Sequence, residues 1–197
     1  MNFCKDNTII LIGRSDYLDK VDSLFPICLD KYKCATINWA CTRYYSEYFF
    51  FLDSYVKKMC LGKILGTPKQ ITVSTNIGLV QDCDFEIYDQ HRVYNNDKIY
   101  TDNTLLGAGF THDYAISYLI KQGYKNVILA GCADFETKQY AEKMNVRTNI
   151  EWKYSEKIRI NSMYLLNHIF PKYINIYTLN PNSALSVKRI TTTELLQ

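Results

Sequence analysis

Two short runs of β-branched and aliphatic residues, each closed by a glycine, constrain the fold of this chain most strongly. Residues 8–13 read Thr-Ile-Ile-Leu-Ile-Gly, and residues 125–131 read Lys-Asn-Val-Ile-Leu-Ala-Gly. Runs of this length and composition are typical of strands buried on both faces of a parallel sheet. Shorter strands of the same kind are predicted at residues 34–38, 48–52, 70–74, 85–88 and 174–179.

Segments with helical periodicity lie between these strands. Apolar residues recur three or four positions apart in residues 16–24, 54–61, 111–122, 137–144 and 156–170. Pro26 is expected to stop the first of these helices, and Gly123 is expected to end the third. The last helix is expected to turn four apolar side chains inward, namely those of Ile160, Met163, Tyr164 and Ile169.

This alternation predicts an α/β fold: a single Rossmann-like domain over residues 1–197, with a mostly parallel sheet and helices on both faces. The Asn- and Asp-rich stretch at residues 75–103 interrupts the alternation. Its length favours a functional loop, and a lid is expected around residues 76–103.

Composition limits the class of protein. Hydrophobic residues make up 47% of the chain, enough for a full core, and no apolar run is long enough to span a bilayer. The seven cysteines are odd in number and lack paired short spacings, which predicts reduced thiols and no zinc site. We therefore expect a cytoplasmic protein without an export signal, stable membrane association, bound metal or cofactor.

Charge is close to balanced, with a net value of +3. Residues 125–197 hold ten Lys or Arg against six Asp or Glu. This mildly basic third suits phosphate groups or nucleic acid as a partner, and it equally suits a solvated helix face. Both interpretations stay open.

Polar groups follow the predicted strands where a parallel sheet binds ligands, at the carboxyl ends of the strands. Gly13-Arg14-Ser15 follows the first strand, and its glycine and the helix start after it suit a phosphate. Asn38 follows the second strand, where a side-chain amide both donates to and accepts from a ribose or base. A simple turn and a simple strand end are the competing interpretations.

A third candidate is the loop of residues 107–113, which enters a helix. Thr111 is the expected N-cap, and the helix N-terminus would favour an anion. His112 is a candidate acid or base at this turn, although a lone histidine is more often structural.

Four segments together resemble the small bacterial sialyltransferases of the Campylobacter lipooligosaccharide type and related sialyltransferase-like proteins. The similar segments are residues 10–22, 34–39, 110–131 and 177–185, including Tyr-Thr-Leu-Asn-Pro-Asn-Ser-Ala-Leu in the last. The resemblance implies a Rossmann-like fold that binds a pyrimidine-nucleotide sugar without a metal.

The resemblance also assigns residues to the site. The family's donor-binding asparagine corresponds to Asn38, and its asparagine after the third strand corresponds to Asp53. Its helix-start serine corresponds to Thr111, and one of its phosphate-binding tyrosines corresponds to Tyr140. Its Pro-Asn-Ser loop corresponds to Pro181, Asn182 and Ser183.

Two departures change the expected chemistry. Arg14 stands where the family has an asparagine, and Tyr154 stands where it has the catalytic histidine. Tyrosine has an ordinary pKa of about 10 and is a poor general base near neutrality. His112, Asp113 and Asp53 are therefore the candidate bases, and Arg14 is expected to neutralise a leaving diphosphate.

The resulting expectation is a metal-independent glycosyltransferase. Its donor would be a UDP- or CMP-sugar acting as co-substrate, and its acceptor a glycan or a hydroxymethylated base in viral DNA. Two alternatives remain: a non-catalytic nucleotide-sugar binding protein, and a nucleotide pyrophosphokinase-like enzyme with a metal at Asp82 and Asp84.

Overall fold

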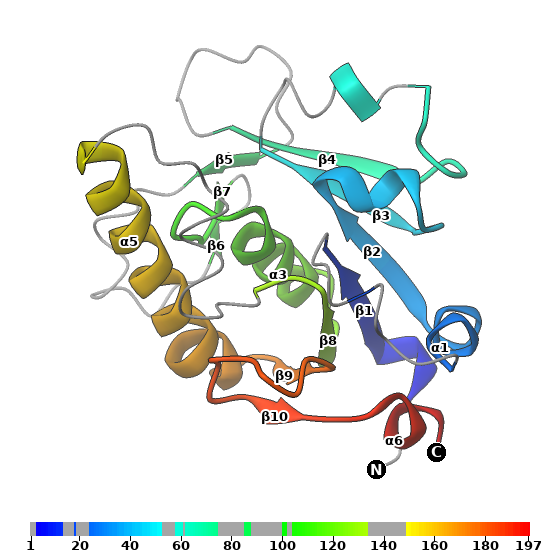
Figure 1. Cartoon of the computed structure of the whole chain (residues 1–197). Helices are drawn as coiled ribbons and strands as arrows, with labels where there is room; N and C mark the ends of the chain where they lie inside the picture. The colour runs from blue at the N-terminus through cyan, green and yellow to red at the C-terminus, as the bar shows by residue number, and fades with distance from the viewer. Residues whose placement is uncertain are drawn as a thin grey trace.

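A 10-stranded sheet runs through the described part of the chain in the order β10-β9-β8-β1-β2-β3-β4-β5-β7-β6 (Figure 1). The computed structural model describes residues 3–13, 18, 24–52, 58–60, 62–74, 85–87, 100–101, 104–133 and 149–197. The strands are β1 (Thr8–Ile12), β2 (Lys33–Ile37), β3 (Tyr48–Phe51), β4 (Lys69–Ser74), β5 (Phe85–Ile87), β6 (Tyr100–Thr101), β7 (Thr104–Leu105), β8 (Asn126–Ala130), β9 (Asn175–Thr178) and β10 (Lys188–Arg189).

Neighbouring strands in this described sheet are parallel, except for the antiparallel pair of β6 and β7. The fold is therefore the α/β Rossmann-like architecture that the alternation predicts. All five residues of β1 are buried, as expected for a strand with neighbours and covering layers on both sides.

The strand order reverses at β1. The chain moves from β1 to β2 and β3 in one direction, whereas β8 returns to pair with the other side of β1. Ile12 at the end of β1 is in register with Thr36 of β2 and with Ala130 of β8. In parallel sheets such a reversal opens a crevice at the carboxyl ends of the strands.

Helices cover both faces of the sheet (Figure 1). The helical segments are α1 (Phe25–Lys31), α3 (Thr111–Lys121), α5 (Asn149–Tyr164), α6 (Thr192–Leu196), the 3-10 helices η1 (Lys5–Asn7), η3 (Asn38–Thr42) and η6 (Phe170–Lys172), and the π-helical turn η5 (Leu165–Ile169). Ile9 and Leu11 belong to the core cluster that includes α3 residues, whereas Ile10 and Ile12 belong to the cluster on the α1 and α6 side. Successive side chains of β1 point to opposite faces of the sheet and thus contribute alternately to the two core clusters.

Pro26 lies in the first turn of α1, which begins at Phe25 and accommodates the proline because this turn needs no N–H from it. The helix that Pro26 was expected to stop lies mostly outside the described residues. The prediction for α5 is wrong in detail. In α5, Ile160 is 54% exposed and Tyr164 is 38% exposed, whereas Met163 and the nearby Ile169 pack partly buried against the core.

The buried face of this helical segment instead carries Ser162, Leu165 and Leu166. Ser162 is polar, so an apolar stripe drawn through the sequence misses it. Its hydroxyl is satisfied by hydrogen bonds to the neighbouring helix, which is the condition for burying a polar group.

Several predictions lie outside the described residues. These are the helix at residues 137–144, most of the helix at 16–24 and most of the lid expected around residues 76–103. Within the described part of the chain, no helix is both long enough and apolar enough to cross a membrane. The described cysteines are free thiols, and all but Cys4 are buried.

Candidate functional site

The carboxyl ends of β1 and β8 meet at two glycines. The backbone N–H of Gly13 donates to the carbonyl of Ala130 at 2.9 Å. A Cβ atom on Gly13 would lie 2.3 Å from the carbonyl oxygen of Gly131 and 2.6 Å from Cβ of Cys132. Close packing against the residues that follow β8 therefore requires a glycine at position 13. From the sequence, this glycine was expected to let a ligand approach the backbone.

Asn38 turns the chain sharply at the end of β2. Its φ angle is 51°, in the left-handed region that non-glycine residues rarely adopt, and asparagine tolerates this region better than most. The side chain is half-buried, and its Oδ1 accepts a hydrogen bond of 3.4 Å from the hydroxyl of Thr111. The fold thus brings together two predicted donor-binding residues that lie 73 positions apart in sequence.

The start of α3 is capped by Asp113. The carboxylate Oδ2 accepts hydrogen bonds from the backbone N–H groups of Ala108 at 3.1 Å and Phe110 at 3.3 Å. The N-cap is Phe110, so Thr111 is the first residue of the helix and the prediction of Thr111 as N-cap is wrong. A carboxylate at the third residue of a helix reaches back to the N–H of the N-cap, as in a capping box. Here it also binds the loop before the helix, and it places a negative charge beside the helix end where an anion was expected.

His112, Ser162 and Asp113 form a buried hydrogen-bonded cluster between α3 and α5. The hydroxyl of Ser162 donates to Asp113 Oδ1 at 2.6 Å, and its oxygen lies 3.0 Å from Nε2 of His112. Because a hydroxyl has one proton, the imidazole is the donor in the second contact. A neutral His112 in this arrangement carries its proton on Nε2.

Burial lowers the pKa of His112, and the carboxylate of Asp113, with Oδ1 3.5 Å from Nε2, acts in the opposite direction. The ring also stacks on Phe110, with centroids 5.2 Å apart and planes 12° from parallel. The cluster therefore contains a neutral imidazole next to a hydrogen-bonded carboxylate. Its geometry is not that of an activated serine nucleophile, because Ser162 donates to the carboxylate and not to the imidazole.

Ser162 is a residue that sequence reasoning missed. The signal was present: Ile158, Ser162 and Leu165 lie at helical spacing, and a serine on such a stripe predicts a buried polar contact. Ile158 marks the same face, because its side chain lies against Gly109, where an added Cβ would come within 3.1 Å.

The turn after β9 holds Asn182 and Ser183, which the resemblance assigns to donor binding. Asn182 is exposed, and its N–H donates to Oδ1 of Asn180 at 2.9 Å, whereas Ser183 is buried and its Oγ accepts from the N–H of Leu185 at 3.3 Å. β9 is two strands from β1 in the sheet, which corresponds to roughly 10 Å at ordinary strand spacing. Asn182 is thus placed at the carboxyl edge, while Ser183 stabilises the turn.

The remaining predicted residues lie outside the described part of the chain, namely Arg14, Ser15, Asp53, Tyr140 and the side chain of Tyr154. Asp82 and Asp84 are also outside it. The described residues contain no group of three or more His, Cys, Asp or Glu side chains that would hold a metal ion.

The geometry therefore defines an α/β protein with polar groups at the topological switch point of a parallel sheet. Comparison of this chain with models of protein families, with curated proteins and with solved structures found no match.

Proposed function

We propose that this chain is a glycosyltransferase that binds a pyrimidine-nucleotide sugar at the carboxyl edge of the sheet, beside the reversal of strand order at β1. The observation that carries the proposal is the contact of Asn38 with Thr111. It places an amide and a hydroxyl at adjoining strand and helix ends, where nucleotides bind in this class of fold. Both groups suit a ribose or a phosphate oxygen.

The catalytic part of the proposal assigns the acceptor's proton to His112, Asp113 or Asp53. Burial holds the pKa of His112 below its ordinary value, which keeps the imidazole in the neutral form that a base needs. Arg14 neutralises the leaving diphosphate in this scheme, so no metal is required. The acceptor is a glycan or a hydroxymethylated base in DNA.

A second candidate function is binding of a nucleotide sugar without turnover. A specific observation favours it: both carboxylate oxygens of Asp113 accept hydrogen bonds, and His112 is bonded to Ser162. These hydrogen bonds stabilise the start of α3. Because the side chains of Asp113 and His112 are engaged in them, they are not available to accept a proton from an acceptor. The two candidates share the nucleotide site and differ in chemistry.

The experiment that tests the proposal has two stages. Thermal unfolding is first compared with UDP, CMP, GDP and their sugars, because a ligand at 100 times its Kd stabilises the folded state by about 2.7 kcal/mol. Release of free nucleotide from the stabilising sugar nucleotide is then measured with EDTA present. Turnover supports the transferase, stabilisation without turnover supports the binding protein, and absence of any stabilisation contradicts both.

A further inference from the structure

Two segments that cover β3 lie side by side and form one surface. They are residues 38–47, between β2 and β3, and the described residues 58–60 and 62–66, between β3 and β4. The N–H of Leu65 donates to the carbonyl of Cys41 at 3.0 Å, and Cys41 and Cys60 belong to one buried cluster. Tyr45 lies against Gly66, where an added Cβ would come within 3.2 Å of the ring. The two segments are thus joined at three places.

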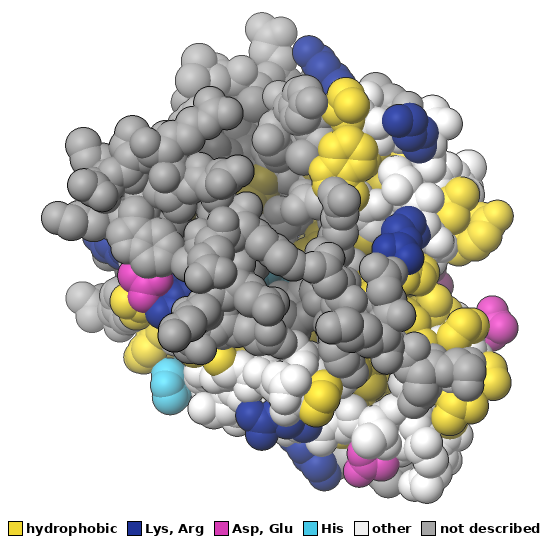
Figure 2. All heavy atoms as spheres, in the orientation of Figure 1, with side chains coloured by type: hydrophobic (Ala, Val, Ile, Leu, Met, Phe, Trp, Pro, Cys, Tyr) yellow, Lys and Arg dark blue, Asp and Glu magenta, His cyan; other side chains and the backbone are white. Residues whose placement is uncertain are grey.

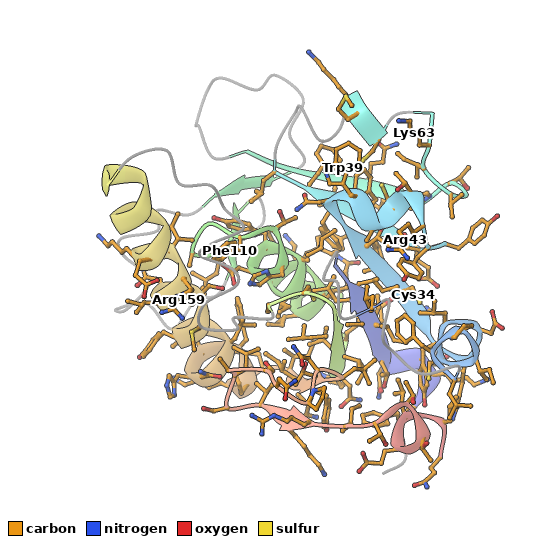
Figure 3. All side chains as sticks on the ribbon, viewed as in Figure 1. Cys34, Trp39, Arg43, Lys63, Phe110 and Arg159 are labelled. Carbon is orange, nitrogen blue, oxygen red and sulfur yellow. The ribbon has the colours of Figure 1, made fainter. Side chains whose placement is uncertain are left out.

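This surface carries both aromatic and basic side chains. Trp39 is half-buried against the cluster of Cys41, Phe49, Phe51 and Cys60, and Tyr45 is 72% exposed. We call the group of Trp39, Arg43, Tyr45, Lys58 and Lys63 the basic–aromatic surface; its three basic residues are exposed. Trp39, Arg43 and Lys63 lie on one side of the molecule (Figure 3), where Lys and Arg side chains stand beside hydrophobic ones (Figure 2).

Positive charge is concentrated in this part of the chain. Residues 38–70 hold five Lys or Arg against two Asp or Glu, an excess that equals the net charge of +3 of the whole chain. Glu47, an acidic residue of the segment, lies 3.9 Å from Lys33, which offsets part of its charge. The guanidinium carbon of Arg43 lies 5.7 Å from the ring centre of Tyr44 and is held over it.

We propose that the basic–aromatic surface binds single-stranded nucleic acid. Lysine and arginine side chains attract the phosphates, and the exposed ring of Tyr45 and the half-buried ring of Trp39 stack on bases that a duplex would hide. A pairing of separated cations with aromatic rings suits a chain of alternating phosphates and bases better than it suits an isolated anion. The proposal is independent of the proposed function, because it requires neither a nucleotide sugar nor transfer.

The position of Trp39 connects this surface to the candidate site. Trp39 follows Asn38 directly, and the left-handed backbone of Asn38 directs the chain from the end of β2 into η3. A bound strand would therefore pass from Lys63 and Arg43 towards the carboxyl edge of the sheet. Failure of strand binding would leave the nucleotide site untouched, so the two proposals are tested separately.

The test uses fluorescein-labelled oligo(dT) of about 20 nucleotides with the full chain, read by anisotropy over a range of salt concentrations. Three phosphate contacts predict a slope of log K against log salt of about −2, since each contact on a single strand contributes about −0.7. Lys63→Glu and Arg43→Glu are each expected to weaken binding by at least about tenfold and to reduce the slope. Both side chains are exposed, so folding is retained.

The matched control is Lys172→Glu, which changes an exposed lysine in η6. η6 adjoins β9, and β9 is separated from β3 by three strands. The same charge change there is expected to leave affinity within about twofold. Equal weakening by all three variants would overturn the proposal, because binding would then follow net charge alone.

Stacking is read from tryptophan fluorescence. The chain has two tryptophans, so Trp152→Phe leaves Trp39 as the reporter. Oligo(dT) is expected to quench it, and Trp39→Leu is expected to weaken binding about fivefold or more, with Trp39→Phe close to wild type. Unchanged Trp39 fluorescence at saturation, or no binding of oligo(dT) by the wild type, overturns the proposal.

Discussion

The hydroxyl oxygen of Ser162 lies 2.6 Å from a carboxylate oxygen of Asp113, and this contact joins the last turn of α5 to the first turn of α3. Both side chains are fully buried. Asp113 also accepts the N–H groups of Ala108 and Phe110, so one carboxylate organises the loop before α3, the start of α3 and the docking of α5. The same carboxylate lies beside His112. Because it holds these three parts of the fold together, the cluster has a structural role in addition to the catalytic role proposed above.

Replacing Ser162 by alanine is expected to destabilise the protein. The substitution removes a hydrogen bond to a buried carboxylate, which costs about 1.5–3 kcal/mol. The free energy of unfolding in urea measures the effect, and Lys157→Ala, at an exposed position of the same helix, should stay within about 0.5 kcal/mol of wild type. Equal stability of the Ser162 variant and wild type would show that the contact contributes nothing.

Stability is expected to fall on acidification because of His112. Burial lowers its pKa in the folded state, so below about pH 6.5 the unfolded chain binds a proton that the folded chain does not. The free energy of unfolding therefore decreases as pH falls from about 7.5 until the pKa of the folded state is reached, and then levels off.

Urea titrations at several pH values between about 5.5 and 7.5 measure this slope. His112→Gln should flatten it, whereas His168→Gln, at an exposed position, should leave it unchanged. Parallel slopes for wild type and His112→Gln would contradict the assignment.

Gly13→Ala is expected to disrupt the junction of β1 and β8. The new methyl group would meet the backbone oxygen of Gly131 at 2.3 Å, and backbone cannot move aside as a flexible side chain does. The expected loss is about 3 kcal/mol or more, at the upper end of the cost of overpacking. Gly62→Ala is the control: an added Cβ meets nothing within 4 Å and carries only the strain of φ +78°, about 1–2 kcal/mol. A Gly13 variant no less stable than this control would refute the steric argument.

Asn38 offers a way to separate ligand contact from backbone conformation. Asn38→Gly removes the amide and keeps the left-handed turn, whereas Asn38→Ala removes the amide and adds strain at φ 51°. If the proposed nucleotide site uses this side chain, calorimetry should show both variants losing roughly 0.5–1.5 kcal/mol of nucleotide binding. Both variants also lose the hydrogen bond from Thr111, so Asn38→Ala should unfold at a lower temperature than Asn38→Gly because only the alanine adds backbone strain. Unchanged affinity in Asn38→Gly removes Asn38 from the site.

The sequence by itself determined the parallel sheet of this protein. Residues 9–12 and 127–130 are continuous apolar runs closed by a glycine, and runs this short and this rich in aliphatic residues are typical of strands covered on both faces. β1 and β8 form where these runs occur, and α3 ends at Lys121, just before Gly123 with its positive φ. These are local properties, because composition and period alone specify them.

The tertiary structure alone decided which strand lies beside which and what the polar residues contact. No local pattern places β8 next to β1, or the hydroxyl of Thr111 against the amide of Asn38, 73 residues earlier. Asp113 and Ser162 differ most from expectation for the same reason: a buried polar side chain is stable only with a partner, and here α5 supplies that partner from 49 positions along the chain. The sequence shows where the polar residues are. The hydrogen bond that makes the burial of Asp113 and Ser162 stable forms only when α3 and α5 pack together.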